Sequence, residues 1–146
     1  MKLIPKELET LYQAAYQARL NSYSPYSGHK VGAAITTREG KIFSGCNVEN
    51  ASYGATICAE RGAIQSAISR EGALEITSVM VVTDANPPWV PCGICRQILA
   101  EFSKKETAVY LANLEGEIRT LTFGELYPLS FTPSELCTGK VGDHKK

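Results

Sequence analysis

Apolar residues near the start of the chain recur at intervals of three and four, which is the spacing of one helix face. The residues that share this face are Leu8, Leu11, Tyr12, Ala15, Tyr16 and Ala18. Pro5 begins the pattern, Glu7 and Glu9 lie in its first turn, and the polar stretch 21–29 follows it. Acidic residues near a helix N-terminus complement the helix dipole. The pattern predicts a helix between Pro5 and the polar stretch.

Five further segments have the composition of β-strands. The runs 30–37 and 41–46 are separated by a short turn, which predicts a hairpin. The run 76–83, ITSVMVVT, is apolar almost throughout, as in a strand that is covered on both faces. Two more strands are predicted at 107–112 and 117–121, again joined by a turn.

Two more helices are predicted, and both begin with cysteine. The first lies within 57–72 and starts at Cys58, and the second spans 92–102 and starts at Cys92. The apolar face of the first comprises Ala59, Ala63, Ile64, Ala67 and Ile68. Short helical turns are expected within 122–128 and 131–136.

The order of these elements predicts an α/β fold. The strand–helix–strand unit over 76–112 implies two parallel strands joined by a right-handed crossover. The hairpin makes the five-stranded sheet mixed, and helices on both of its faces give a three-layer α-β-α sandwich. We expect a single domain over residues 1–146, with a flexible polar tail at 138–146.

Composition narrows the class of partner. The 146 residues carry 15 basic and 15 acidic side chains, so the formal net charge is zero and no basic field is available for a nucleic-acid backbone. No apolar run approaches the roughly 20 residues of a membrane span, and the N-terminus lacks a signal-peptide pattern. We therefore expect a cytoplasmic protein that binds neither nucleic acid nor membrane.

The five cysteines indicate metal binding or catalysis rather than disulfides, because their number is odd and a secretion signal is lacking. Cys92 and Cys95 alone are equally compatible with half of a structural zinc site, a redox dithiol or a catalytic site. Cys58 disfavours the dithiol, since three sulfurs would converge if the two helix starts lay side by side. Cys46 and Cys137 are expected to be small structural residues.

A zinc site at these helix starts has a physical basis. A helix N-terminus lowers the pKa of a thiol, and Arg61 and Arg96 could offset the charge of three thiolates. Three protein ligands with one open position are typical of catalytic zinc, whereas four are typical of structural zinc. Glu60 could then move protons to and from a zinc-activated water. On its own, Glu60 could equally be an ordinary acidic residue of a first helical turn.

The sequence Cys-Ala-Glu at 58–60, followed by Pro-Cys-x-x-Cys at 91–95, resembles the signature of the zinc nucleobase deaminases. Four motifs, PYSGHKVGAA, GCNVENASYG, CAERGAI and PCGICRQ, stand in the order found in the small cytidine deaminases. The resemblance covers most of the chain. It implies a cytidine deaminase-like fold, a nucleoside substrate, and a homotetramer whose active sites lie at subunit interfaces.

The resemblance also implies roles at the metal. Cys58, Cys92 and Cys95 would hold one zinc ion per subunit. Glu60 would be the catalytic proton shuttle and would meet the base at N3. Arg61 would donate a hydrogen bond to a ligand sulfur and temper its charge.

Substrate contacts are implied in the same way. Asn47 and Glu49 resemble the pair that binds the ribose hydroxyls, and the backbone amide of Ala59 would hold the pyrimidine O2. Phe131 resembles a C-terminal aromatic residue that reaches the site of a neighbouring subunit. His29 stands where the family has a phenylalanine against the pyrimidine ring. Imidazole is smaller than a phenyl ring, polar and titratable near neutral pH. His29 is therefore either a replacement that leaves the substrate unchanged or a determinant of base preference.

Two neighbouring positions leave alternatives open. Val90 stands where the family usually has a serine, which does not matter if only its carbonyl is used. Trp89 either shapes the pocket wall or packs against the core.

The predicted reaction is the zinc-dependent hydrolytic deamination of cytidine and deoxycytidine to uridine and deoxyuridine, with release of ammonia, in pyrimidine salvage. One alternative keeps this chemistry but acts on a modified cytosine nucleoside or an analogue such as blasticidin S. A non-enzymatic alternative is a structural zinc-binding module. Zero net charge argues against a deaminase that edits RNA or DNA.

Overall fold

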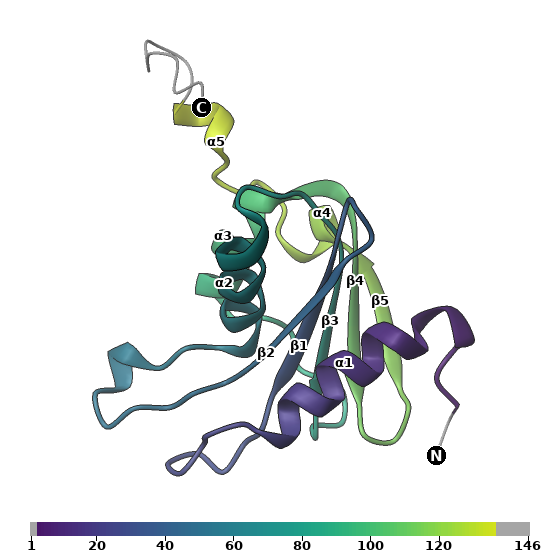
Figure 1. The fold of residues 1–146 in the computed structure, drawn as a ribbon, viewed down its shortest axis with the longest axis vertical. Coiled ribbons are helices and arrows are strands. Elements are labelled where there is room, and N and C mark those ends of the chain that lie inside the picture. Colours follow the sequence, from purple (N-terminus) through teal and green to yellow (C-terminus); the bar gives the residue numbers. More distant parts are fainter. Residues whose placement is uncertain (1–2, 137–146) are drawn as a thin grey trace.

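The computed structural model describes residues 3–136, which form one sheet with helices packed on both of its faces (Figure 1). The predicted tail at 138–146 and Cys137 lie outside the described residues. Within 3–136, none of the helices combines the length and the apolar character that crossing a membrane requires. The elements, in chain order, are the 3-10 helix η1 (Lys6–Leu8), α1 (Glu9–Leu20), β1 (Gly32–Thr37), β2 (Ile42–Cys46), the 3-10 helix η2 (Tyr53–Ala55), α2 (Ala59–Glu71), β3 (Ile76–Thr83), α3 (Gly93–Phe102), β4 (Ser103–Asn113), β5 (Ile118–Thr122), α4 (Phe123–Leu126) and α5 (Pro133–Leu136).

The sheet has the strand order β2-β1-β3-β4-β5. β3 and β4 are parallel and are joined through α3, whereas the other three neighbouring pairs are antiparallel. The predicted mixed, five-stranded sheet and the predicted parallel pair are therefore confirmed.

Alternate side chains of the central strands enter two separate cores, because successive residues of a strand point to opposite faces. On β3, Val79 and Val81 belong to the core beneath α2 and α3, whereas Met80 and Val82 pack against α1. β1 follows the same rule, with Ile35 in the first core and Ala34 in the second. Figure 1 shows α1 crossing one face while α2 and α3 lie on the other. The predicted three-layer sandwich is confirmed.

β4 begins at Ser103, whereas the apolar pattern predicted its start at Thr107. Residues 103–106 are polar, so they carry no apolar strand signal. Ser103 nevertheless pairs with Ile76 of β3, and the Thr107 hydroxyl accepts from the Lys104 amide and donates to the Ile76 carbonyl. The pairing with β3 shifts register at this point.

Two glycines allow helices to approach the sheet closely. A Cβ at Gly45 would lie 2.4 Å from the backbone nitrogen of Ala63 in α2, and one at Gly32 would lie 1.9 Å from the carbonyl oxygen of Ala15 in α1. Neither helix could keep its place if the glycine became larger. The position of α2, and hence of the residues at its start, depends on the missing side chain of Gly45.

We expect Gly45→Ala to lower the free energy of unfolding by about 3 kcal/mol, because the backbone of α2 must move away from β2. Gly54→Ala is the matched control, since a Cβ there meets nothing within 4 Å; its effect should stay within about 0.5 kcal/mol. Urea unfolding followed by circular dichroism measures both. Equal unfolding midpoints for the two variants would contradict the close-packing explanation.

Candidate metal centre and substrate pocket

Three cysteine sulfurs converge where α2 and α3 begin. Cys58 is the N-cap residue of α2, Cys92 is that of α3, and Cys95 lies in the first turn of α3. The three sulfur atoms all lie within 4.8 Å of one another, and Cys58 Sγ is 3.9 Å from Cys92 Sγ. Cys46 is half-buried on β2 and is not part of this cluster.

The spacing and the chemistry of these sulfurs fit zinc. Zn–S bonds of about 2.3 Å in a tetrahedron separate two sulfurs by about 3.8 Å, which is close to the 3.9 Å between Cys58 and Cys92. Thiolates are soft ligands that suit zinc. Among residues 3–136 the cluster comprises three possible ligands, so a fourth position would remain open, as in catalytic sites.

The thiols differ in acidity because they interact with one another. A hydrogen bond from Cys95 is the largest influence that lowers the pKa of Cys58 to about 5, and Cys92 and the Arg61 guanidinium add to it. The same bond, together with burial, raises the pKa of Cys95. Arg61 Nη2 also donates to the Thr56 carbonyl, while its buried Nε has no hydrogen-bond partner. Arg61 therefore sits where it can stabilise negative charge on sulfur.

Arg96, the other arginine expected to offset thiolate charge, donates hydrogen bonds to two backbone carbonyls instead. Its Nε donates to the Pro91 carbonyl at 2.8 Å, and its Nη1 donates to the Leu126 carbonyl at 3.0 Å. It thereby holds the segment that leads into Cys92.

Glu60 is a buried carboxyl beside the sulfur cluster. It stands in the first turn of α2 but is only 4% exposed. Burial raises its pKa to about 7, and the negative charge of Cys58 adds to the shift. An exposed acidic residue at a helix start would have ready access to water, so the burial of Glu60 favours a chemical role.

A cavity of about 300 Å³ lies against this cluster. Cys95 is fully buried and does not line it. The predicted site residues that line it are His29, Asn47, Glu49, Cys58, Ala59, Glu60 and Cys92. The structure thus brings seven of the predicted residues, from all four quoted motifs, around one cavity.

The motifs did not single out other residues of the cavity wall, namely Ser27, Val31, Thr56, Val81 and Thr83. Val81 and Thr83 lie at the carboxyl end of β3, where ligands commonly bind in α/β sheets, so that rule could have found them. Ser27 stands inside the quoted motif PYSGHKVGAA. Trp89 and Val90 also line the cavity, so Trp89 contributes to the pocket wall and is 44% exposed.

The side-chain amide of Asn47 ties the loop before β1 to the pocket. Its Oδ1 accepts from the Val31 amide at 2.8 Å and from the Ser22 hydroxyl, and its Nδ2 donates to the His29 carbonyl at 2.8 Å. A primary amide has two acceptor sites and two N–H groups. These contacts leave one N–H for a ligand.

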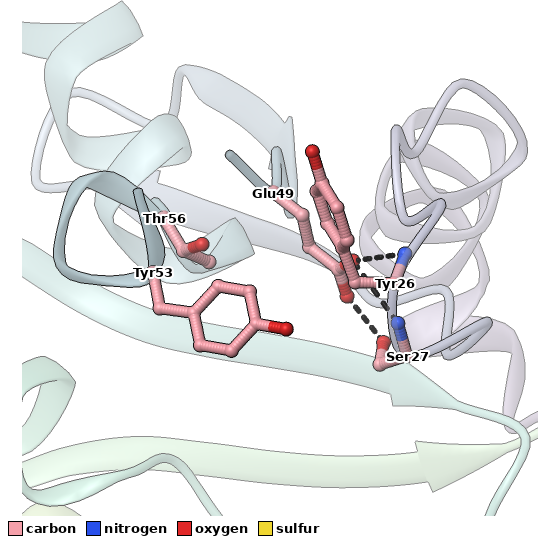
Figure 2. Close-up of a pocket in the computed structure, with 5 residues that line it drawn as sticks. All are labelled: Tyr26, Ser27, Glu49, Tyr53 and Thr56. Carbon is pink, nitrogen blue, oxygen red and sulfur yellow. Dashed lines mark hydrogen bonds between the residues drawn. The ribbon is translucent and has the colours of Figure 1, made fainter. Parts of the chain in front are cut away.

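The carboxylate of Glu49 is held by the same loop, as Figure 2 shows. Its Oε2 accepts from the amides of Tyr26 at 2.8 Å and Ser27 at 3.1 Å, and its Oε1 accepts from the Ser27 hydroxyl. The hydroxyl bond is the largest of the influences that lower the pKa of Glu49. The carboxylate therefore stays ionised and retains lone pairs for a further donor.

A second cavity, of about 360 Å³, adjoins the first (Figure 2). Its lining residues are Tyr26, Ser27, Glu49, Tyr53 and Thr56. Ser27, Glu49 and Thr56 line both cavities. Glu49 therefore lies at the boundary between the two spaces, and the rings of Tyr26 and Tyr53 pack edge to face beside it, 5.8 Å apart.

His29 forms an aromatic corner of the first cavity, the one that lies against the sulfur cluster. Its ring packs edge to face against Trp89, with centroids 4.8 Å apart and planes at 72°. Its Nδ1 lies 4.0 Å from Asp84 Oδ1, and the other Asp84 oxygen lies 3.5 Å from Arg19 Nη2. The position where the family resemblance implied phenylalanine thus carries an imidazole next to a carboxylate.

Phe131 lies outside the cavity of its own chain. Its ring is half exposed, and its carbonyl accepts from Gln97 Nε2 at 2.9 Å. It precedes α5, which projects from the sandwich in Figure 1. The expected contact with a neighbouring subunit stays a prediction.

Together, fold and site define an α/β protein of the zinc-hydrolase type, with three thiols and a buried carboxyl beside a ligand-sized cavity. A family model for the cytidine and deoxycytidylate deaminase zinc-binding region matches residues 5–111. The chain belongs to this family.

Individual relatives support the assignment. Cytidine deaminase of Halalkalibacterium halodurans is 45% identical to this chain, over 88% of this chain and 96% of its own length. The crystal structure of cytidine deaminase from Burkholderia pseudomallei has a TM-score of 0.80 at 44% identity and covers 84% of this chain and 98% of its own. Blasticidin-S deaminase of Bacillus cereus is 32% identical, over 71% of this chain and 78% of its own.

We expect the purified protein to carry about one zinc ion per chain, and Cys58→Ser to reduce that content to about a tenth or less, because a three-thiolate site loses a ligand. Cys46→Ser is the matched control and should keep its zinc. Inductively coupled plasma mass spectrometry of the dialysed proteins measures the content. A full complement of zinc in Cys58→Ser would show that the metal binds elsewhere.

Proposed function

We propose that this protein is a zinc-dependent cytidine deaminase. It converts cytidine and deoxycytidine to uridine and deoxyuridine with release of ammonia, as part of pyrimidine salvage. The observation that carries the proposal is the convergence of three thiols and the buried carboxyl of Glu60 beside one cavity. Membership of the deaminase family and the cytidine deaminases among its relatives support it.

Cys58, Cys92 and Cys95 would hold one zinc ion per subunit. When bound, the ion would supply a Lewis acid and lower the pKa of a water molecule that attacks C4 of cytosine. Glu60 takes one proton from that water and delivers it to N3 of the base as the C4–O bond forms. It then takes the second proton from that oxygen and delivers it to the departing amine, so that the C4–N bond breaks and ammonia leaves. Its place in the cavity wall, one residue beyond Ala59 and two beyond Cys58, allows one carboxyl to serve each step.

Backbone and wall residues orient the base. The amide of Ala59 belongs to the first turn of α2, where N–H groups have no acceptor within the helix, so it donates to the pyrimidine O2. His29 and Trp89 form the aromatic corner against which the ring lies. Excluding water from this space strengthens each of these polar contacts.

The sugar is bound by Asn47 and Glu49. Asn47 has one N–H left after its contacts within the chain, and Glu49 is an ionised acceptor. Together they match the donor and acceptor character of ribose hydroxyls.

The lining of the two cavities favours a nucleoside over a nucleotide. No lysine or arginine occurs among the described residues that line either cavity, and both are lined by the Glu49 carboxylate. A phosphate group carries nearly two negative charges at neutral pH and would be repelled by Glu49.

The protein is proposed to act in the cytoplasm as a homotetramer, with Phe131 of each chain completing the site of a neighbour. The exposed ring of Phe131 and the projecting C-terminal segment support this arrangement. A structural zinc module is less well supported, because the cluster within 3–136 offers three sulfurs and lies beside a buried carboxyl.

The proposal predicts that the zinc-loaded protein releases uridine and ammonia from cytidine. It also predicts that kcat/KM for deoxycytidine 5′-monophosphate is lower than that for deoxycytidine by about 100-fold or more, since like charges brought together cost several kcal/mol. Chromatographic product assays measure both activities. Glu49→Gln should narrow the difference.

Two results would contradict these predictions in different ways. Absence of uridine with zinc bound would overturn the proposed activity. Equal use of the nucleotide and the nucleoside would instead overturn the substrate class and leave the deamination chemistry in place.

A further inference from the structure

The Ser27 hydroxyl joins two walls of the pocket. It donates to Glu49 Oε1, and it accepts from the His29 amide at 3.1 Å. The same residue donates its own amide to Glu49 Oε2 at 3.1 Å. Figure 2 shows Ser27 beneath the Glu49 carboxylate, with its two hydrogen bonds to that carboxylate drawn as dashed lines. One serine therefore fixes both oxygens of Glu49 and the backbone of the residue that forms the aromatic corner.

Backbone hydrogen bonds and the Asn47 side chain also attach the segment that carries Glu49 to the loop. The Tyr23 amide donates to the Asn47 carbonyl at 3.1 Å, and the Glu49 amide donates to the Tyr23 carbonyl at 2.8 Å. These bonds place the chain but leave the Glu49 side chain free to rotate. Because Glu49 is only half-buried, its side chain could rotate towards water without the bonds to its carboxylate.

We propose that Ser27 is a positioning residue, whose hydroxyl holds the Glu49 carboxylate in the orientation that accepts a sugar hydroxyl and couples it to the wall formed by His29. The inference rests on the proposed function, since it assumes that Glu49 binds the sugar of a cytosine nucleoside. The amides of Tyr26 and Ser27 alone bind Oε2 and permit rotation about the carboxylate. The hydroxyl bond to Oε1 removes that freedom.

The proposal separates sugar binding from chemistry. Loss of the Ser27 hydroxyl should weaken the contact between Glu49 and the substrate, which exists only when the sugar carries hydroxyl groups. The KM for cytidine should rise, while kcat should stay nearly constant because Glu60 and the three cysteines are untouched. A nucleoside without those hydroxyls, 2′,3′-dideoxycytidine, should bind equally well before and after the change.

The experiment compares Ser27→Ala with wild type on cytidine and on 2′,3′-dideoxycytidine, using zinc-loaded protein. We expect the KM for cytidine to rise about tenfold, with kcat within about twofold and with kcat/KM for the dideoxynucleoside unchanged. Ser27→Thr keeps a hydroxyl and should restore the KM. Ser24→Ala is the matched control, because this serine lies in the same loop and lines neither cavity.

A double variant distinguishes positioning from a general structural effect. If Ser27 acts through Glu49, adding Ser27→Ala to Glu49→Gln should not raise the KM for cytidine further. Equal loss of kcat/KM on both nucleosides, additive effects in the double variant, or an unchanged KM would each overturn the proposal. Failure of the proposed function would show differently, since the wild type itself would then turn over neither nucleoside.

Discussion

Three thiol groups lie close enough together to share one metal ion, and much of the structure can be understood from that convergence. Cys58 comes from one helix start, and Cys92 and Cys95 come from another that is more than thirty residues away in sequence. Two helices on the same face of a sheet can supply this only if their N-termini point to the same place. The antiparallel β1–β2 pair and the parallel β3–β4 pair set those directions. Gly45 then lets α2 approach closely enough for its first residue to reach α3.

The same convergence places three thiols and the buried carboxyl of Glu60 close together. Like charges at such distances repel strongly unless a cation or hydrogen-bond donors oppose them. Within the chain, the first turns of the two helices and the Arg61 guanidinium supply part of this opposition. Burial of Glu60 beside the sulfurs adds to the cost. A divalent cation would offset the negative charge that the thiols acquire when they lose their protons.

Much of this site could be predicted from sequence because its determinants are local. A helix N-cap position is a short-range property of the sequence. The apolar face of 57–72 predicted a helix that packs on the core, with Cys58 and Glu60 at its N-terminus. The alternation of β3 between two cores likewise follows from residue order alone. Such features depend on neighbours a few positions apart, which a pattern of residue types records.

Other features depend on contacts between distant segments and could not be predicted in this way. The first residues of β4, 103–106, are polar and resemble a loop in the sequence. The Thr107 hydroxyl bonds to the Lys104 amide and the Ile76 carbonyl, which no residue pattern records. Asn47 and Glu49 were predicted as ligand-binding residues, but their hydrogen bonds to the loop before β1 depend on which segments the fold brings together. Ser27 stands inside the motif PYSGHKVGAA, but its hydrogen bonds to Glu49 depend on the same contacts between distant segments.

Proton transfer by Glu60 beside a three-thiolate zinc ion can be tested by measuring the kcat for cytidine of Glu60→Gln together with its zinc content. We expect kcat to fall by about 100-fold to 10,000-fold while about one zinc ion per chain remains bound. Glu101→Gln, an exposed carboxylate on α3, should behave as wild type. A Glu60→Gln protein that keeps its zinc and deaminates cytidine at the wild-type rate would contradict the claim.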